Sequence, residues 1–385
     1  MPSLPPLPAT TVFERMSALA RETGSINLGQ GFPEMKEPAE LIEAARRALV
    51  ERPNQYPPMR GLAELKQAIC GYYRESQSLA VDVDEVVVTS GATEALAAAI
   101  LAFVRPGDEV IAIQPLYDAY VPLIERAGGT ARLVSLTPPD WRLPLDALRA
   151  AISPATRMVL ANTPHNPTGA MMSRAEVEAL GALCEEHDLI LLCDEVWEGM
   201  TFTGEPHISP LTIPSLRERA VKIGSAGKIF SLTGWKVGWA VAAPPLAARI
   251  AAQHQFLTFT TAPPLQWAVA EGLALPPAWH TAHRARYAAA RSRLIAGLEA
   301  AGFHVLPSQG TWFVTVDLAA SGLPAQDEAV AEQLVREARV AAIPVSAFYV
   351  EAAERGFLRF CFTKEDPVLD QALERLARFR AKHVT

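Results

Sequence analysis

The chain has 385 residues, of which 50% are hydrophobic and 20% are charged, so it is long enough for two domains with a substantial core. Its formal net charge of −7 argues against a nucleic-acid-binding or anionic-membrane surface. No apolar stretch approaches the roughly 18 residues that a membrane helix needs. We therefore expect neither a nucleic-acid nor a membrane partner.

The first eight residues, Met-Pro-Ser-Leu-Pro-Pro-Leu-Pro, predict an arm, because proline favours extended conformations. They lack the basic start and long apolar run of a signal peptide, so we expect a cytoplasmic protein. The four cysteines show no CxxC spacing; Cys193 and Cys361 lie in apolar runs and are predicted to be buried thiols. Among the scattered histidines, His280 and His283 form the only close pair, without a nearby cysteine, so no metal site is expected.

A short helix is predicted at Thr11–Thr23, followed by a turn at Ser25–Pro33. From about residue 40 to 245, short apolar strands alternate with helical patterns such as Thr93–Phe103 and Arg174–His187. This alternation indicates an α/β fold with a mostly parallel sheet covered by helices on both faces. The seven predicted strands are Glu85–Thr89, Glu109–Ile113, Ala131–Leu136, Arg157–Asn162, Leu189–Asp194, Val221–Ser225 and Gly238–Ala242.

Residues from about 245 to 300 are predicted to be mostly helical, with a proline-rich break near Leu275–Pro277. Beyond residue 303 the pattern changes to that of a smaller α+β domain with a closing helix. Its predicted elements are a strand at Trp312–Val316, a helix at Glu328–Ala338 and a strand at Phe357–Phe362. We place the N-terminal arm and part of the small domain at residues 1–40, a large domain at 41–275 and the small C-terminal domain at 276–385.

Polar and aromatic residues follow one predicted strand after another, and ligands of such sheets bind at the carboxyl ends of the strands. The first strand leads into Ser-Gly-Ala-Thr at 90–93, which opens a helix whose free N–H groups suit an anion. The next strands end near an aromatic, Tyr117, an amide, Asn166, and a carboxylate, Asp194.

A lysine follows the next strand. Three of the seven lysines fall within residues 221–239, and Lys228 comes directly after an apolar run and a small-residue turn. Unlike arginine, a desolvated lysine can act as an amine nucleophile and form a Schiff base. A solvated basic turn would explain this segment taken alone. An anion cradle, an aromatic, an amide, a carboxylate and a lysine together describe a pyridoxal phosphate pocket.

The sequence resembles the class I, fold-type I pyridoxal-phosphate-dependent aminotransferases, and within them the kynurenine, glutamine and methionine transaminase group. The resemblance runs from Asn27 to about Asp366 and is carried by the pattern Ser-x-Gly-Lys-x-Phe-Ser-x-Thr-Gly-Trp-Lys at 225–236 and by Asn-Pro-Thr-Gly at 166–169. It implies a small domain formed by the N- and C-terminal segments, and transamination between an L-amino acid and a 2-oxo acid.

The resemblance also implies roles for individual residues. Lys228 would hold the cofactor as an internal aldimine and move the α-proton, and Asp194 would pair with the pyridine nitrogen. Asn166 would donate to the ring O3′ and contact the substrate, and Tyr117 would stack on the ring. The implied phosphate ligands are Gly91, Ala92, Thr93, Ser225 and Lys236.

Two further cofactor contacts are implied. Tyr56 resembles a tyrosine that reaches the phosphate of the neighbouring subunit, which implies a homodimer; a plain loop tyrosine is the alternative. Trp197 stands where the family usually has a tyrosine that donates to O3′. The indole N–H of tryptophan is also a donor, although it is bulkier and does not titrate near neutral pH.

Arg359 matches the arginine that binds the substrate α-carboxylate, a role that suits its planar fork. Gly31 would let the backbone approach the same carboxylate. Residues 254–264, which match the segment that supplies a second arginine in aspartate-specific relatives, contain no arginine or lysine but include Phe259. Phe13 matches an aromatic of the neutral-substrate relatives, so the resemblance predicts a neutral substrate such as methionine, glutamine, or an aromatic or other apolar amino acid. The alternative is that these aromatic residues form the core of a dimer interface.

Two alternatives remain at this stage. A β-lyase acting on cysteine conjugates or cystathionine-like substrates would use the same scaffold and the same Lys228. The sensor domain of a transcription regulator would also bind the cofactor. Such regulators carry a basic DNA-binding module in front, whereas the fold here is predicted to start within the first 30 residues.

Overall fold

A computed structural model describes residues 11–383 of the chain, so the arm predicted for residues 1–8 lies outside the described part. The chain divides into two compact units. The large unit comprises Phe32–Ala288 and Pro307–Thr311, and the small unit comprises the residues up to Gly31, Ala289–Leu306 and the residues from Trp312 onward. These divisions fall after Gly31 and Ala288, whereas the sequence analysis places them after residues 40 and 275.

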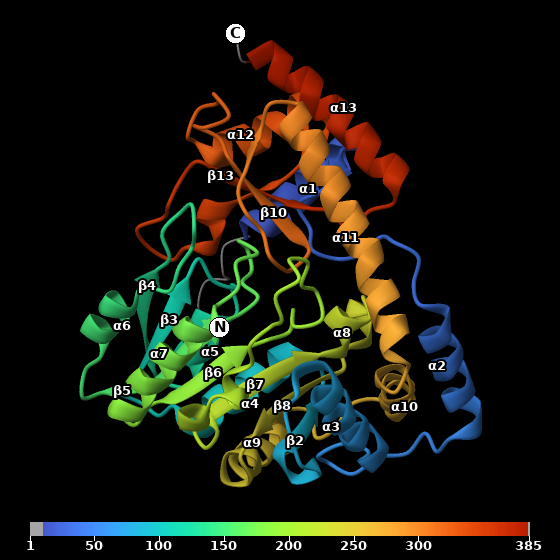
Figure 1. Cartoon of the computed structure of the whole chain (residues 1–385), viewed down its shortest axis with the longest axis vertical. Coiled ribbons are helices and arrows are strands. Elements are labelled where there is room, and N and C mark those ends of the chain that lie inside the picture. Colours follow the sequence, from blue (N-terminus) through green and yellow to red (C-terminus); the bar gives the residue numbers. More distant parts are fainter. Residues whose placement is uncertain (1–10, 384–385) are drawn as a thin grey trace, which may run out of the picture. The chain divides into compact units, whose positions relative to one another are not determined.

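The large unit is built around a seven-stranded sheet in the order β2-β8-β7-β6-β5-β3-β4, with helices on its faces (Figure 1). Only β8 runs antiparallel to its neighbours, so the predicted mostly parallel sheet is confirmed, and the strand bounds differ from the prediction by no more than a residue. The strands are β2 (Val86–Thr89), β3 (Glu109–Gln114), β4 (Thr130–Ser135), β5 (Thr156–Asn162), β6 (Ile190–Asp194), β7 (Ala220–Ser225) and β8 (Gly238–Ala242).

Apart from the edge strand β4, which is partly exposed, these strands are short, mostly apolar runs that are buried on both faces, as a helix-covered parallel sheet requires. The proline-rich break predicted near 275–277 separates α10 from α11. The helices are α2 (Ala39–Glu51), α3 (Ala63–Gln77), α4 (Ala92–Phe103), α5 (Tyr120–Arg126), α6 (Leu145–Ala151), α7 (Arg174–Glu186), α8 (Ala226–Ile229), α9 (Pro244–Leu257), α10 (Pro263–Leu273) and α11 (Pro277–Ala300), whose last part belongs to the small unit.

The small unit joins the two ends of the chain. Strand β1 (Ile26–Asn27), which follows α1 (Val12–Thr23), pairs in parallel with β11 (Val340–Ala341). A second sheet has the order β12-β13-β10-β9. Its strands and the remaining helices are β9 (His304–Val305), β10 (Phe313–Asp317), β12 (Ile343–Pro344), β13 (Phe357–Cys361), α12 (Asp327–Gln333) and α13 (Asp366–His383).

The cysteines agree with their predicted environment, since Cys193 and Cys361 are fully buried and all four cysteines are free thiols. Over residues 11–383, the helices are all too short or too polar to cross a membrane.

Candidate active site

A cavity of about 260 Å³ lies at the carboxyl ends of the central strands of the large unit. Ten residues that the sequence analysis assigns to the cofactor line it together. They are Gly91, Ala92, Thr93, Tyr117, Asn166, Asp194, Trp197, Ser225, Lys228 and Lys236. Seven further residues complete the lining: Leu96, Tyr120, Asn162, Val196, Gly227, Thr233 and Val237.

Lys228 is placed in this cavity by a tight turn of the chain. Strand β7 ends at Ser225, and the four-residue helix α8 begins at the next residue, so that Lys228 lies less than one turn beyond the strand. Its Nζ atom lies 4.6 Å from the centre of the Trp197 ring. A cation this close to an indole ring is attracted by its electron-rich face, which arises from the quadrupole of the neutral ring.

Asp194 is the last residue of β6 and is buried in the cavity wall. Its Oδ2 accepts a hydrogen bond from the hydroxyl of Tyr120 at 2.7 Å, and its Oδ1 accepts one from the backbone N–H of Val196 at 3.2 Å. Burial raises the pKa of Asp194, while these two hydrogen bonds and the charge of Lys228 oppose the rise. The carboxylate is therefore fixed in orientation and shielded from water.

Tyr120 is the most informative residue that the sequence analysis did not assign. It lies three residues after Tyr117, at the start of α5, and their rings meet edge to face with centroids 5.6 Å apart. The spacing of three residues places both rings on one side of the helix start. It was the one feature of the sequence that could have indicated that Tyr120 lies near Tyr117. The bond of the Tyr120 hydroxyl to Asp194 depends on the pairing of distant strands, which the local sequence does not reveal.

The loop after β5 is fixed to the end of β6 by an asparagine. The Asn162 side-chain amide donates to the carbonyl oxygen of Asp194 at 2.7 Å, and its Oδ1 accepts the backbone N–H of Asn166 at 2.8 Å. Asn166 is thereby held at the cavity, as the sequence predicts, by a residue that the prediction did not include.

An anion cradle forms at the start of α4. Gly91 precedes the helix with φ of 82°, a conformation that favours glycine, and offers no side chain to cap the first N–H groups. A Cβ atom at Gly91 would lie 3.2 Å from Cε and Nζ of Lys236, a tight contact that would displace the end of this lysine side chain. The N-terminus of a helix together with an ammonium group suits a phosphate.

The small unit surrounds Arg359 with aromatic rings. Its guanidinium carbon lies 3.8 Å from the ring centre of Phe313, 4.7 Å from that of Phe348 and 5.9 Å from that of Phe13. Its Nη2 donates to the carbonyl oxygen of Gly29 at 2.7 Å. Burial lowers the pKa of Arg359 to about 9. In such a dry environment a carboxylate ligand interacts more strongly with the guanidinium than it would in water.

Gly31 belongs to the same cluster, because a Cβ atom there would lie 2.5 Å from the tip of the Phe313 ring. The small unit thus brings together Phe13, Gly31 and Arg359, three of the residues predicted to bind substrate. Phe313 and Phe348, which pack closest to the guanidinium, were not predicted, because each is one aromatic among many in apolar segments.

Tyr56 and Phe259 do not line the cavity and lie instead on the surface of the large unit. The side chain of Tyr56 is 83% exposed, and its ring meets that of Phe259 at a centroid distance of 5.6 Å. Phe256 and Leu257 are exposed beside them in sequence. Their predicted roles therefore depend on a second subunit.

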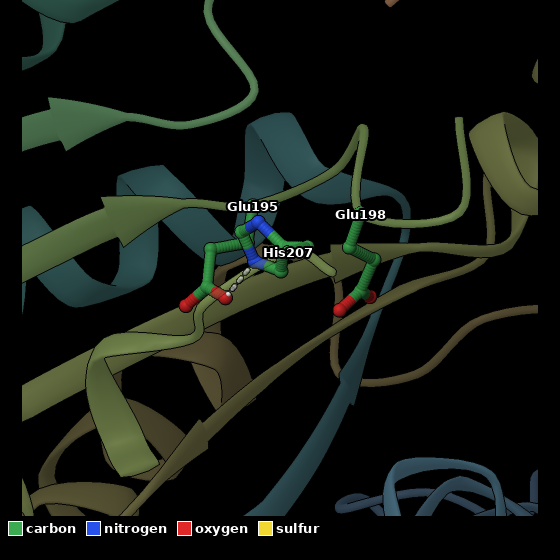
Figure 2. A group of neighbouring side chains, drawn as sticks. All are labelled: Glu195, Glu198 and His207. Carbon is green, nitrogen blue, oxygen red and sulfur yellow. Dashed lines mark hydrogen bonds and ion pairs between the residues drawn. The ribbon is translucent and has the colours of Figure 1, made fainter. Parts of the chain in front are cut away.

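The structure also gathers a buried group that the sequence analysis did not predict. Glu195, Glu198 and His207 place one side-chain oxygen or nitrogen each within 4.8 Å of one another (Figure 2). Glu195 directly follows the cavity residue Asp194 in sequence, and Glu198 directly follows the cavity residue Trp197. No local pattern indicated that His207, in the loop after β6, would join them.

A family model, described as aminotransferase class I and II, matches residues 23–376 of the chain. The chain belongs to this family. The aminotransferase is 42% identical over 381 residues to a probable N-succinyldiaminopimelate aminotransferase of Mycobacterium tuberculosis, with 96% of each chain covered. It is 40% identical over 368 residues to the methionine aminotransferase of Escherichia coli, with 95% of each covered.

Solved structures show the same likeness. The aminotransferase matches the structure of N-succinyldiaminopimelate aminotransferase from Mycobacterium tuberculosis with a TM-score of 0.92, covering 96% of this chain and 97% of that one. It matches the methionine aminotransferase structure from Escherichia coli with a TM-score of 0.94, covering 98% and 100%. The fold-type I architecture and the transaminase class expected from the sequence are thereby confirmed.

Proposed function

We propose that this aminotransferase binds pyridoxal 5′-phosphate in the cavity of the large unit and transfers amino groups from neutral L-amino acids to 2-oxo acids. The observation that carries the proposal is the joint placement of Lys228, Asp194 and Lys236 in one cavity of the large unit. The cofactor needs an amine, a partner for its ring nitrogen and an anion cradle, and this donor set supplies all three. The residues present therefore fit the group.

Pyridoxal phosphate, when bound, supplies an aldehyde that reacts with amines and a ring that accepts electrons. The helix start at Ala92 and Thr93, with Ser225 and Lys236, would hold its phosphate. Asp194, kept in place by Tyr120, would hold a proton on the ring nitrogen. Tyr117 would stack on the ring.

The remaining chemistry falls to other side chains. Asn166 and Trp197 would contact the ring O3′, with the indole N–H of Trp197 as a donor. Lys228 would bind the cofactor covalently and carry the substrate α-proton between carbon atoms as a general base and acid. Arg359 would bind the substrate α-carboxylate through two parallel N–H donors, with Gly31 leaving space for it.

A neutral side chain is favoured by the residues outside the cavity. The segment 254–264 has no arginine or lysine but includes Phe259, and Phe13 lies beside Arg359 in the small unit. Burying a distal carboxylate against such a surface without a cation is costly, whereas an apolar side chain gains roughly 1.5–3 kcal/mol by burial. The names of the relatives include both a neutral substrate, methionine, and an acidic one, N-succinyldiaminopimelate.

A panel of single-turnover half-reactions tests the function and its substrate together. We expect kcat/KM for methionine, glutamine and phenylalanine to exceed that for aspartate by at least about tenfold, the ratio that roughly 1.4 kcal/mol of differential binding produces. N-succinyldiaminopimelate belongs in the panel as the acidic comparison. Measuring 2-oxo acid with and without an amino acceptor separates transamination from β-elimination. A higher value for aspartate than for the neutral amino acids contradicts the preference.

We also propose that the active unit is a homodimer in which Tyr56 contacts the neighbouring cofactor phosphate. The exposed cluster of Tyr56, Phe256, Leu257 and Phe259 supports this, since large apolar patches on a protein surface mark interaction sites. We expect sedimentation velocity to give twice the 41.6 kDa chain mass, and Tyr56→Phe to weaken cofactor binding without dissociating the dimer. A monomer that is fully active contradicts the proposal.

Four free cysteines favour a reducing compartment, the cytoplasm.

A further inference from the structure

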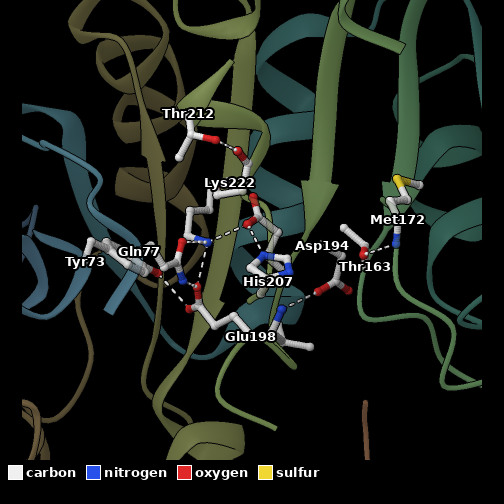
Figure 3. A network of polar contacts seen from close by, with 12 residues as sticks. Tyr73, Gln77, Thr163, Met172, Asp194, Glu198, His207, Thr212 and Lys222 are labelled. Carbon is white, nitrogen blue, oxygen red and sulfur yellow. Dashed lines mark hydrogen bonds and ion pairs between the residues drawn. The ribbon is translucent and has the colours of Figure 1, made fainter. Parts of the chain in front are cut away.

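A lysine lies at the centre of the buried group beside the cofactor cavity. Nζ of Lys222 contacts Oε2 of Glu195 and Oε2 of Glu198, each at 2.6 Å, and all three side chains are fully buried. Glu198 also accepts hydrogen bonds from the Tyr73 hydroxyl at 2.9 Å and the Gln77 amide at 2.6 Å (Figure 3). The ring Nε2 of His207 lies 2.6 Å from Oε2 of Glu195, which completes the network.

The positive charge that balances the carboxylates of this network is the ammonium group of Lys222, not a metal ion. Glu195, Glu198 and His207 have ligand atoms close enough for a divalent ion, but the ammonium group of Lys222 contacts both carboxylates. Burial alone would lower the pKa of Lys222, yet the two carboxylates hold it above the ordinary lysine value. Burial would likewise raise the pKa of Glu195, yet Lys222 and His207 hold it below the ordinary value. Both charges therefore persist at neutral pH.

The network lies on the face of the sheet opposite to Asp194. Strands β6 and β7 are paired in parallel with Cys193 beside Lys222 and Asp194 beside Ile223. Side chains alternate between the two faces along a strand, so Lys222 projects away from the face that carries Asp194. Trp239 of β8 pairs with Gly224 of β7, two residues beyond Lys222, and donates its indole N–H to the hydroxyl of Tyr73 at 2.7 Å, so it belongs to the Lys222 face.

Consequently, some side chains of the turn after β6 face the cofactor cavity and the others face Lys222. Asp194 and Trp197 line the cofactor cavity, while Glu195 and Glu198 contact Lys222. Backbone bonds hold the turn at both glutamates, because the N–H of Glu195 donates to the carbonyl oxygen of Ile223 at 3.0 Å and the N–H of Glu198 donates to that of Glu195 at 2.9 Å. The carbonyl oxygen of Asp194 accepts further bonds from Asn162 and Thr163, and that of Trp197 accepts the N–H of Met200. The two ion pairs fix the two glutamates through their side chains.

We propose that Lys222, through Glu195 and Glu198, acts as a positioning residue that orients Asp194 and Trp197 toward the cofactor. The inference rests on the proposed function and extends it to residues that touch neither cofactor nor substrate. Removing the lysine takes away the cation that two buried carboxylates share, leaving Glu195 with His207 and Glu198 with the neutral donors Tyr73 and Gln77, which is strongly unfavourable. The turn must then rearrange to hydrate them, and Asp194 and Trp197 move with it.

The test compares Lys222→Met with Glu198→Gln. The methionine keeps most of the side-chain volume and removes the charge, while Glu198→Gln keeps the shape and breaks one ion pair. We expect both to raise the dissociation constant of pyridoxal phosphate from the apoprotein about ten- to a hundredfold, as displaced supporting residues do in other sites. We also expect a shifted visible absorption maximum and a kcat lowered by up to about a hundredfold with KM nearly unchanged.

Glu85→Gln is the matched control. Glu85 is also a buried carboxylate of the large unit, paired with Arg217 at 2.6 Å, but it does not line the cofactor cavity. We expect it to lower the melting temperature of the apoprotein while leaving the cofactor dissociation constant and the spectrum unchanged.

The outcomes separate the possible explanations. If Lys222→Met and Glu198→Gln behave like Glu85→Gln, melting earlier but binding the cofactor normally, the network is merely structural and the inference is overturned. If Lys222→Met does not fold, Glu198→Gln alone decides by the same two readouts. A wild-type protein that does not bind pyridoxal phosphate contradicts the proposed function itself, and the inference with it.

Discussion

Replacing Lys228 with alanine is expected to abolish transamination, lowering kcat by at least about 10⁴-fold, the upper range for the loss of a general acid–base group. The loss should exceed that of any other single substitution, because the same side chain is proposed to bind the cofactor covalently. The phosphate cradle at Gly91 and Lys236 remains in this variant, so cofactor should still bind non-covalently. Steady-state kinetics and cofactor titration measure the two effects separately.

Lys228→Arg is the appropriate comparison, since arginine keeps the positive charge beside Trp197 but cannot act as an amine nucleophile. It should be as inactive as Lys228→Ala. Borohydride treatment of the yellow wild-type protein should attach the cofactor to Lys228, as peptide mapping would show. A label on another residue, or an active Lys228→Arg, would show that Lys228 is not the reactive amine.

Replacing Arg359 with alanine has the second largest expected effect and should lower kcat/KM for every amino acid substrate by a similar factor. The α-carboxylate is common to all of them, and the loss of a buried, charge-assisted pair costs about 2–5 kcal/mol, or roughly 30- to 5,000-fold. Kinetics with methionine, glutamine and phenylalanine provide the measurement. A variant that loses one substrate and retains another would show that Arg359 recognises the side chain instead.

Arg359→Lys controls for the lost charge. It keeps a cation among the rings of Phe313 and Phe348 but loses the bidentate fork, so its activity should fall between those of alanine and wild type. Cofactor affinity should be unchanged in both variants, because Arg359 is not among the residues that line the cofactor cavity.

The strands and the polar residues that follow them could be predicted from local signals in the sequence. The places of Trp197, Ser225 and Lys236 at the cofactor came only from the resemblance to the aminotransferase family. An apolar run followed by a turn indicates a strand such as β6. The residue that ends such a strand, here Asp194, lies at the carboxyl end of the sheet, where ligands bind. Residue types that are rare in such positions, Lys228 above all, then indicate the chemistry.

The supporting residues leave no such signal. Tyr120 reaches Asp194 across 74 positions of sequence, and Lys222 contacts Glu195 across 27. Lys222 stood out in the sequence only as one lysine of a basic segment, although its side chain is fully buried. Whether a side chain points to the cavity or away from it depends on strand register, which a single sequence does not specify.

The composition of the small unit has a consequence for how the protein is made. Strand β1 pairs with β11, so Ile26 meets Val340 only after almost the whole chain has been synthesised. Domains generally fold as they leave the ribosome, and the large unit can complete its sheet first. Until then β11 and β12, against which α1 packs, do not exist, although Met16 and Ala20 of this helix are buried in the finished protein. We therefore expect the apolar face of α1 to remain exposed during most of translation, as a surface that chaperones can bind.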